Sequence, residues 1–79
     1  MRDQTTGLPM RVSTDGTAGP YIRVPFDQLV EVRQLLESHR IPFWVGENAI
    51  SVSGGPFMVV VNLGREGDAR AVQAILDSQ

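Results

Sequence analysis

The chain contains no cysteine among its 79 residues. This absence excludes disulfides, thiolate nucleophiles and zinc sites built on cysteine. It is typical of proteins that work in a reducing compartment, and we expect a cytoplasmic protein. Lysine is absent as well, so all seven basic residues are arginine. We interpret that choice as the codon bias of a GC-rich bacterial genome.

Long apolar runs and an excess of positive charge are also missing. The longest apolar run, residues 56–61, is far too short to cross a bilayer. Residues 1–7 lack the apolar core of a signal peptide. The net charge of −2 argues against nucleic acid, because binding a phosphate backbone needs a basic face. We therefore expect neither a membrane nor a nucleic-acid partner.

The composition nevertheless predicts a folded domain. Hydrophobic residues make up 42% of the chain and charged residues 20%, which is close to the globular average. A chain of this length forms one domain and buries only roughly 60% of the surface that its unfolded form exposes. So thin a core leaves little material for a deep active-site cleft, and we expect a protein that is not an enzyme by itself.

The hydrophobic pattern predicts a strand, a helix, two or three strands and a final helix. Strand patterns cover residues 21–24, 42–45, 49–53 and 57–63. Helical spacing covers residues 26–39 and 68–77, where Asp68 is a good N-cap. Each helix has one apolar stripe, and a right-handed crossover places both helices on the same side of the sheet.

Residues 1–19 precede the α/β domain that we place at residues 20–79, and two interpretations of them stay open. The segment is either a flexible tail rich in threonine and glycine or partly a β-hairpin. In the hairpin, residues 10–13 form a strand that pairs antiparallel with residues 21–24. The Asp-Gly pair at 15–16 is a strong turn signal that favours the hairpin.

This order of elements predicts the α/β (α+β) class, as a two-layer sandwich. It corresponds to a ferredoxin-like βαββα arrangement that lacks its last strand. Both helices would cover one face of a three- to five-stranded, mostly antiparallel sheet. A strand at residues 10–13 would fill the missing edge and make the domain a circular permutation of that fold.

Two stretches of the chain resemble one family. Residues 35–45 resemble the helix-to-strand step of small bacterial signal-transducing domains of unknown function, and residues 68–76 resemble their ending. Those domains are similar in fold to the nitrogen-regulatory PII-type proteins. The family usually has glycine where this chain has Arg40. The resemblance covers residues 20–77 in pattern, implies an interaction or regulatory role, and carries no site residues over.

The titratable and hydroxyl side chains form no catalytic constellation. His39 is the only histidine and has no nucleophile or further metal ligand near it in sequence. Asp27 and Glu31 lie one helical turn apart, and we interpret them as part of a solvated face. Ser51 and Ser53 lack the frame of a nucleophile elbow. We expect no catalytic residue, no cofactor and no metal.

The loop before the last helix is the candidate anion-binding site. Gly64, Arg65 and Gly67 precede a helix N-terminus, whose free N–H groups can hold an anion. The P-loop and dinucleotide fingerprints are missing, and Glu66 and Asp68 add negative charge. The loop is therefore either a small-anion or nucleotide sensor or a plain connection capped by Asp68.

The sheet face turned away from the helices is the candidate interface. Strand alternation sends one set of side chains to that face: Tyr21, Arg23, Trp44, Met58, Val60 and Asn62. Exposed apolar and aromatic patches mark interfaces, unless the N-terminal segment folds back over them. We expect a non-enzymatic protein-interaction or regulatory module, with a protein partner that is most simply a second copy. The alternatives are the anion sensor and an enzyme whose pocket forms between subunits.

Overall fold

The chain folds into five short strands and three helical segments in the computed structural model, which describes residues 1–15, 19–46, 50–51 and 57–79. The strands are β1 (Val12–Ser13), β2 (Tyr21–Pro25), β3 (Trp44–Val45), β4 (Ile50–Ser51) and β5 (Phe57–Asn62). The helices are the short 3-10 helix η1 (Phe26–Gln28), α1 (Leu29–Ser38) and α2 (Ala69–Asp77). The predicted helix at residues 26–39 thus begins with a 3-10 turn.

The strands form one antiparallel sheet in the order β1-β2-β5-β3, with β4 beside β5 as well. Both β3 and β4 lie on the side of β5 that β2 leaves free, so together they make one edge of a four-stranded sheet. The two strands of this edge differ in register, because Val45 lies opposite Val61 whereas Ile50 lies opposite Met58.

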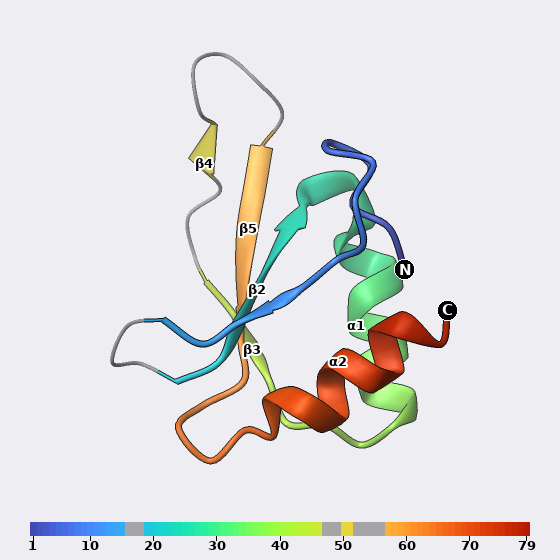
Figure 1. Ribbon diagram of the computed structural model, residues 1–79. Coiled ribbons are helices and arrows are strands. Elements are labelled where there is room, and N and C mark those ends of the chain that lie inside the picture. The colour runs from blue at the N-terminus through green and yellow to red at the C-terminus, as the bar shows by residue number, and fades with distance from the viewer. Residues whose placement is uncertain (16–18, 47–49, 52–56) are drawn as a thin grey trace.

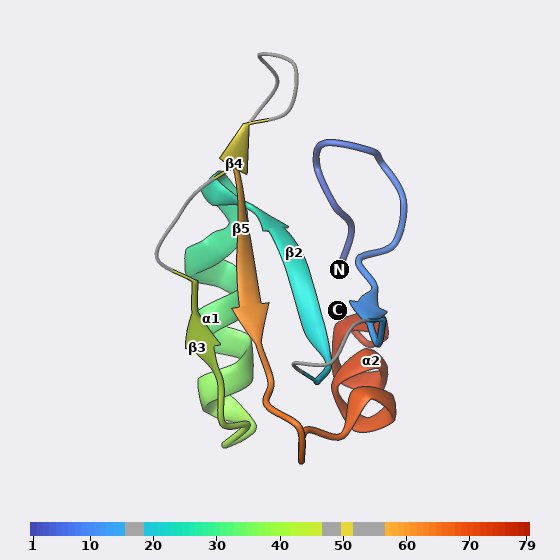
Figure 2. The ribbon, with the colours of Figure 1, turned by 90° about the vertical axis from the view of Figure 1, so that its left-hand side faces the viewer.

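The fold class is α+β, with an antiparallel sheet and two helices behind one of its faces (Figure 2). The predicted hairpin is confirmed, because Val12 pairs with Ile22 and Ser13 with Tyr21. The observed order β-β-α-β-β-α is not the strict ferredoxin order βαββαβ, since two strands, rather than one, precede the first helix. The predicted strand at 42–45 is shorter than expected, because Pro42 has no N–H to donate.

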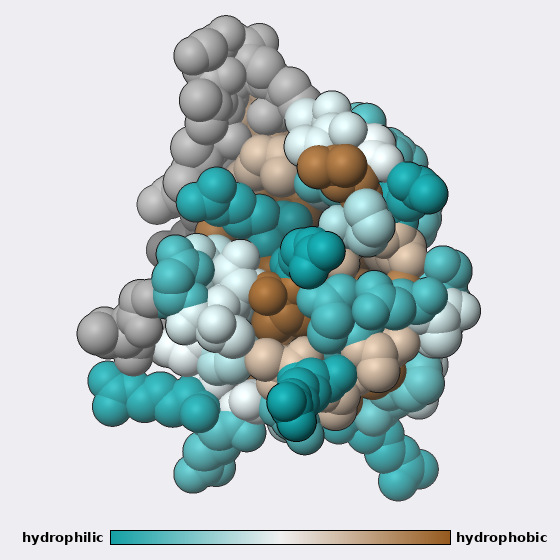
Figure 3. Space-filling view, in the orientation of Figure 1, coloured by the Kyte–Doolittle hydropathy of each residue, from teal (hydrophilic) through white to brown (hydrophobic). Residues whose placement is uncertain are grey.

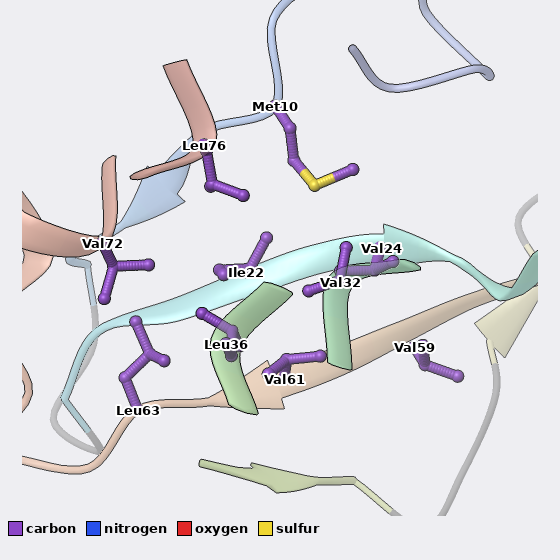
Figure 4. Close-up of a cluster of buried hydrophobic side chains, with 10 residues drawn as sticks. All are labelled: Met10, Ile22, Val24, Val32, Leu36, Val59, Val61, Leu63, Val72 and Leu76. Atoms are coloured by element: carbon purple, nitrogen blue, oxygen red, sulfur yellow. The ribbon is translucent and has the colours of Figure 1, made fainter. Parts of the chain in front are cut away.

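The hydrophobic core lies between the sheet and the two helices (Figures 1 and 4). Ile22 and Val24 of β2 and Val59 and Val61 of β5 point inward, as expected from strand alternation. The helices and loops supply the remaining buried side chains, which are Met10, Val32, Leu36, Leu63, Val72 and Leu76. Met10 is only 2% exposed, so the segment before β1 is part of the core rather than an appendage.

Gln28, the residue before α1, holds the first residues of the chain in place. Its side chain is only 2% exposed. Nε2 of Gln28 donates to the carbonyl oxygen of Arg2 at 2.7 Å, and Oε1 accepts from the N–H of Gln4 at 2.8 Å. The amide therefore satisfies one acceptor and one donor of the backbone, which would otherwise need water.

Gln73 of α2 makes the same arrangement further along the segment. Its Nε2 donates to the carbonyl oxygen of Met10 at 3.0 Å, and its Oε1 accepts from the N–H of Val12 at 2.8 Å. In both cases the amide bonds the C=O of one residue and the N–H of the residue two further on. These are the groups that a neighbouring strand would contact, so the two glutamines extend the pairing of the segment beyond β1.

The C-terminus of α1 ends on a residue with left-handed backbone. Arg40 has φ of 57°, and it is the non-glycine residue with positive φ in the part of the chain that the structure describes. The N–H of Arg40 donates to Glu37 at 3.0 Å, and the N–H of Ile41 donates to Leu36 at 2.9 Å. This pattern is a Schellman motif, whose left-handed position usually holds glycine.

We predict that Gln28→Ala lowers the free energy of unfolding by about 2 kcal/mol, because it leaves two backbone groups without partners. The amide of Gln4 should also exchange its hydrogen faster. Urea denaturation and hydrogen exchange measure the two effects. Gln34→Ala, on the exposed face of α1, is the control and should change stability by less than about 0.5 kcal/mol. Equal stability of the two variants would contradict the role of Gln28.

We also predict that Arg40→Gly stabilises the domain by about 0.5–1 kcal/mol, because glycine adopts positive φ without a Cβ penalty. The gain should appear as a higher urea midpoint with an unchanged slope. Arg40→Ala removes the same side chain but keeps the Cβ, so it should give no gain. A gain of the same size in both variants would show that the arginine side chain, not the backbone, is responsible.

Candidate functional site

The open face of the sheet carries a row of side chains that crosses all four strands. Ser13 pairs with Tyr21, Tyr21 with Asn62, and Asn62 with Trp44. Directly paired residues point to the same side of a sheet, and the helices lie on the other side (Figure 2). Trp44, at the β3 end of the row, is 54% exposed.

The neighbouring rows place the other expected interface residues on the same face. Arg23 pairs with Val60, and Pro25 pairs with Met58. Arg23 is exposed, whereas Val60 and Met58 are half-buried. The register therefore brings Tyr21, Arg23, Trp44, Met58, Val60 and Asn62 together on one face, which we call the open face from here on.

The N-terminal segment reaches the margins of the open face. The hydroxyl of Tyr21 donates to Oδ1 of Asp15 at 2.9 Å. At the opposite end, the hydroxyl of Thr5 lies 4.0 Å from the sulfur of Met58. Because Trp44 stays half exposed, the described part of the segment does not fold back over the aromatic end of the open face.

The flank formed by β1 and α2 has a different character from the open face. In Figure 3 this flank is mainly hydrophilic, and its hydrophobic atoms lie in small patches that polar atoms separate. Scattered apolar atoms of this kind are normal for a protein surface. The open face, which combines an exposed tryptophan with several half-buried apolar side chains, is therefore the better candidate for an interface.

A groove of about 680 Å³ lies beside Trp44, between β3 and the loop that leads to α2. Apolar side chains of Ile41, Leu63 and Val72 contribute to its lining. Gly64 has φ of +80°, and a Cβ built on it would lie 3.4 Å from Cζ3 of Trp44. A Cβ at that distance would make an ordinary van der Waals contact, so the positive φ rather than the indole ring favours glycine here. Trp44 borders both the groove and the open face.

The candidate anion site forms another wall of this groove. Gly67 donates its N–H to the carbonyl oxygen of Gly64 at 2.9 Å, and Arg65 is exposed. Asp68 is the N-cap of α2, as predicted, and its Oδ1 accepts from the N–H of Ala71 at 3.0 Å. A carboxylate of the chain thus occupies part of the helix N-terminus where an anion would bind.

The remaining candidates from the sequence do not come together into a site. His39 caps α1, and Asp27 and Glu31 lie on exposed surface. Ser51 lies in β4, and Ser53 is outside the described residues. Across residues 1–15, 19–46, 50–51 and 57–79, no three His, Asp or Glu side chains are grouped as metal ligands would be.

Two features of the structure were missed from the sequence. Gln28 is buried. It precedes Val32 and Leu36 by four and eight residues, so helical spacing extends the apolar stripe of α1 back to it. This spacing is a signal from which its burial could have been predicted. The groove was also missed, because its walls come from segments about 20 residues apart in the chain.

No helix within the described ranges is long and apolar enough to span a membrane.

Comparison of the chain with protein-family models, with curated proteins and with solved structures finds no match. The function therefore has to be inferred from the geometry of the chain itself. The similarity of residues 35–45 to bacterial signal-transducing domains stays a prediction.

We predict that inorganic phosphate at millimolar concentration raises the melting temperature of the wild type and of Arg65→Ala by the same small amount. Phosphate stabilises folded proteins in general because it is excluded from their surface, whereas Asp68 already occupies part of the α2 N-terminus. Differential scanning calorimetry at constant ionic strength measures both shifts. A larger increase in the wild type, lost in Arg65→Ala, would instead indicate an anion site at this loop.

Proposed function

We propose that the protein is a non-enzymatic interaction module that binds a second copy of itself through the open face. The observation that carries this proposal is the half-exposed indole of Trp44 at the end of a row of side chains that crosses the sheet. Tryptophan and tyrosine are enriched among the residues that dominate binding energy. A second copy is the simplest partner, because it is present wherever the protein itself is present.

The charges of the open face support a second copy over other partners. Arg23 is the charged residue in the three rows that the described strand pairs form, and Trp44 offers the electron-rich face of an indole. Two copies can therefore satisfy each other, because each supplies the cation of Arg23 and the indole of Trp44. Nucleic acid is disfavoured by the net charge of −2.

The fold supports the same role. The strand order β1-β2-β5-β3 corresponds to a ferredoxin-like sheet whose last strand has moved to the start of the chain. We infer a circularly permuted ferredoxin-like sandwich, a two-layer architecture that leaves one sheet face for binding. The family resemblance of residues 35–45 implies an interaction or regulatory role as well.

The size of the open face sets the expected affinity. Strands of two, five, two, two and six residues, spaced about 4.8 Å apart at about 3.3 Å per residue, span on the order of 300 Å² per copy. A standard protein interface buries about 800 Å² per partner. We therefore expect a weak, reversible dimer, with a dissociation constant on the order of 100 µM.

We predict that Trp44→Ala weakens dimerisation about 30-fold, which corresponds to roughly 2 kcal/mol for the loss of an interface anchor. Sedimentation equilibrium from low micromolar to millimolar protein measures the dissociation constant. Val30→Ala is the control, because Val30 is an equally exposed apolar residue on α1, behind the sheet, and it should leave dimerisation unchanged.

Trp44 is the one tryptophan of the chain, so its fluorescence gives a second readout. Its emission should shift to the red when the wild type is diluted through the dissociation constant, because the ring returns to water. The circular dichroism spectrum of Trp44→Ala should match that of the wild type. A wild type that stays monomeric at millimolar concentration would overturn the proposed self-association.

A further inference from the structure

Arg23 and Trp44 lie on opposite sides of β5, and this placement distinguishes between the ways in which two open faces can meet. Arg23 of β2 is paired with Val60, and Trp44 of β3 is paired with Asn62. Val60 and Asn62 belong to the same face of β5, which is the strand between β2 and β3. The cation and the indole are therefore one strand spacing from β5, on either side of it.

A two-fold axis that crosses the strands at the centre of the open face gives an unfavourable arrangement. Such an axis lays β2 of one copy on β2 of the other. When this axis is level with Val60, Arg23 lies directly opposite the partner's Arg23. Two guanidinium groups would then face each other across the interface, and their like charges would disfavour this arrangement.

A two-fold axis that runs along β5 gives the opposite result. This axis places β5 against the partner's β5 and β2 against the partner's β3. Each row of paired side chains keeps its position along the strand direction. Arg23 and the partner's Trp44 are then offset by one row, two residues or about 6.6 Å along the strand. An extended arginine side chain spans that distance, and its guanidinium can lie over the indole face.

We propose that the dimer has its two-fold axis along β5, with Arg23 of each copy against the partner's Trp44. This inference rests on the proposed self-association through the open face. Face-to-face sheets that keep their strands nearly aligned are one of the two common sheet packings. The isologous contact then uses the same two residues twice, as a two-fold interface requires.

The absence of cysteine from the chain allows a direct test, because every single-cysteine variant carries one thiol. Residues on the axis face their own copy, so Met58→Cys, Val60→Cys and Asn62→Cys should each be cross-linked to a dimer by a short bis-maleimide. Packed sheets lie about 10 Å apart, which such a reagent bridges.

Two further variants give the comparison. Arg23→Cys lies one strand spacing off the axis, so its two copies are about 14 Å apart when sheet separation and lateral offset are combined. Compared at protein concentrations that give equal dimer fractions by sedimentation, it should cross-link much more slowly than the three axial variants. Ser38→Cys, exposed at the end of α1 behind the sheet, gives the rate of random collision.

The outcomes separate the two proposals. Fast cross-linking at all three β5 positions, with Arg23→Cys slow, supports an axis along β5. Fast cross-linking at Arg23→Cys and at one β5 position alone means an axis across the strands, which overturns this inference but keeps the self-association. If no variant exceeds Ser38→Cys near the expected dissociation constant, both the axis and the proposed function fail.

Coupling between Arg23 and Trp44 gives an independent measurement. Arg23→Met keeps most of the aliphatic length and removes the charge, so a double-mutant cycle with Trp44→Leu reports the cation–π contact. We expect the two single variants to weaken dimerisation, and the double variant to weaken it by less than their combined effect. Additive effects would mean that the two side chains do not meet across the interface.

Discussion

The pairing of β2 with β5 is the interaction on which the rest of the domain depends. Five residue pairs join the strands, from Tyr21 with Asn62 to Pro25 with Met58. Because successive side chains alternate between faces, this register assigns every residue of both strands to the core or to the open face. A slip by one residue would bury Arg23 and expose Ile22, so the hydrophobic pattern strongly favours the observed register.

Coverage of the sheet follows from that register. The inward residues of β2 and β5 need an apolar layer, and α1 and α2 supply it with two fully buried side chains each. The segment before β2 closes the remaining side through Met10 (Figure 4). The amides of Gln28 and Gln73 accept hydrogen bonds from backbone N–H groups of this segment. The segment can therefore be buried without leaving these groups unpaired.

The small number of described elements also explains why Trp44 and Arg23 of the open face are exposed. Within the described residues, both α1 and α2 lie on the other side of the sheet and the N-terminal segment reaches only the margins of the open face, so they form no third layer there. Most outward side chains are therefore half-buried by their neighbours on the sheet, whereas Trp44 and Arg23 are exposed to water. In the dimer that we propose, the exposed cation of one copy complements the exposed indole of the other.

Local sequence determined the elements whose causes are local. Alternation at residues 21–24 and 57–63, helical spacing at 26–39 and 68–77, and the cap at Asp68 depend on neighbours within a few residues, and the structure contains all of them. The composition of the open face followed from the same alternation. The class of the fold was therefore predictable, and so were the residues that gather on its uncovered side.

Only the tertiary structure decided what depends on contacts between distant segments. Gln28 is buried because it meets Gln4, 24 residues away, and Gln73 is ordered by Val12, 61 residues away. Met10 enters the core because these contacts carry its segment there. Arg40 takes a left-handed backbone because the chain must turn from α1 towards β3. Helical spacing places Gln28 on the apolar stripe of α1, but local pattern does not specify its partners. Each of these positions depends on the packing of elements that the sequence separates.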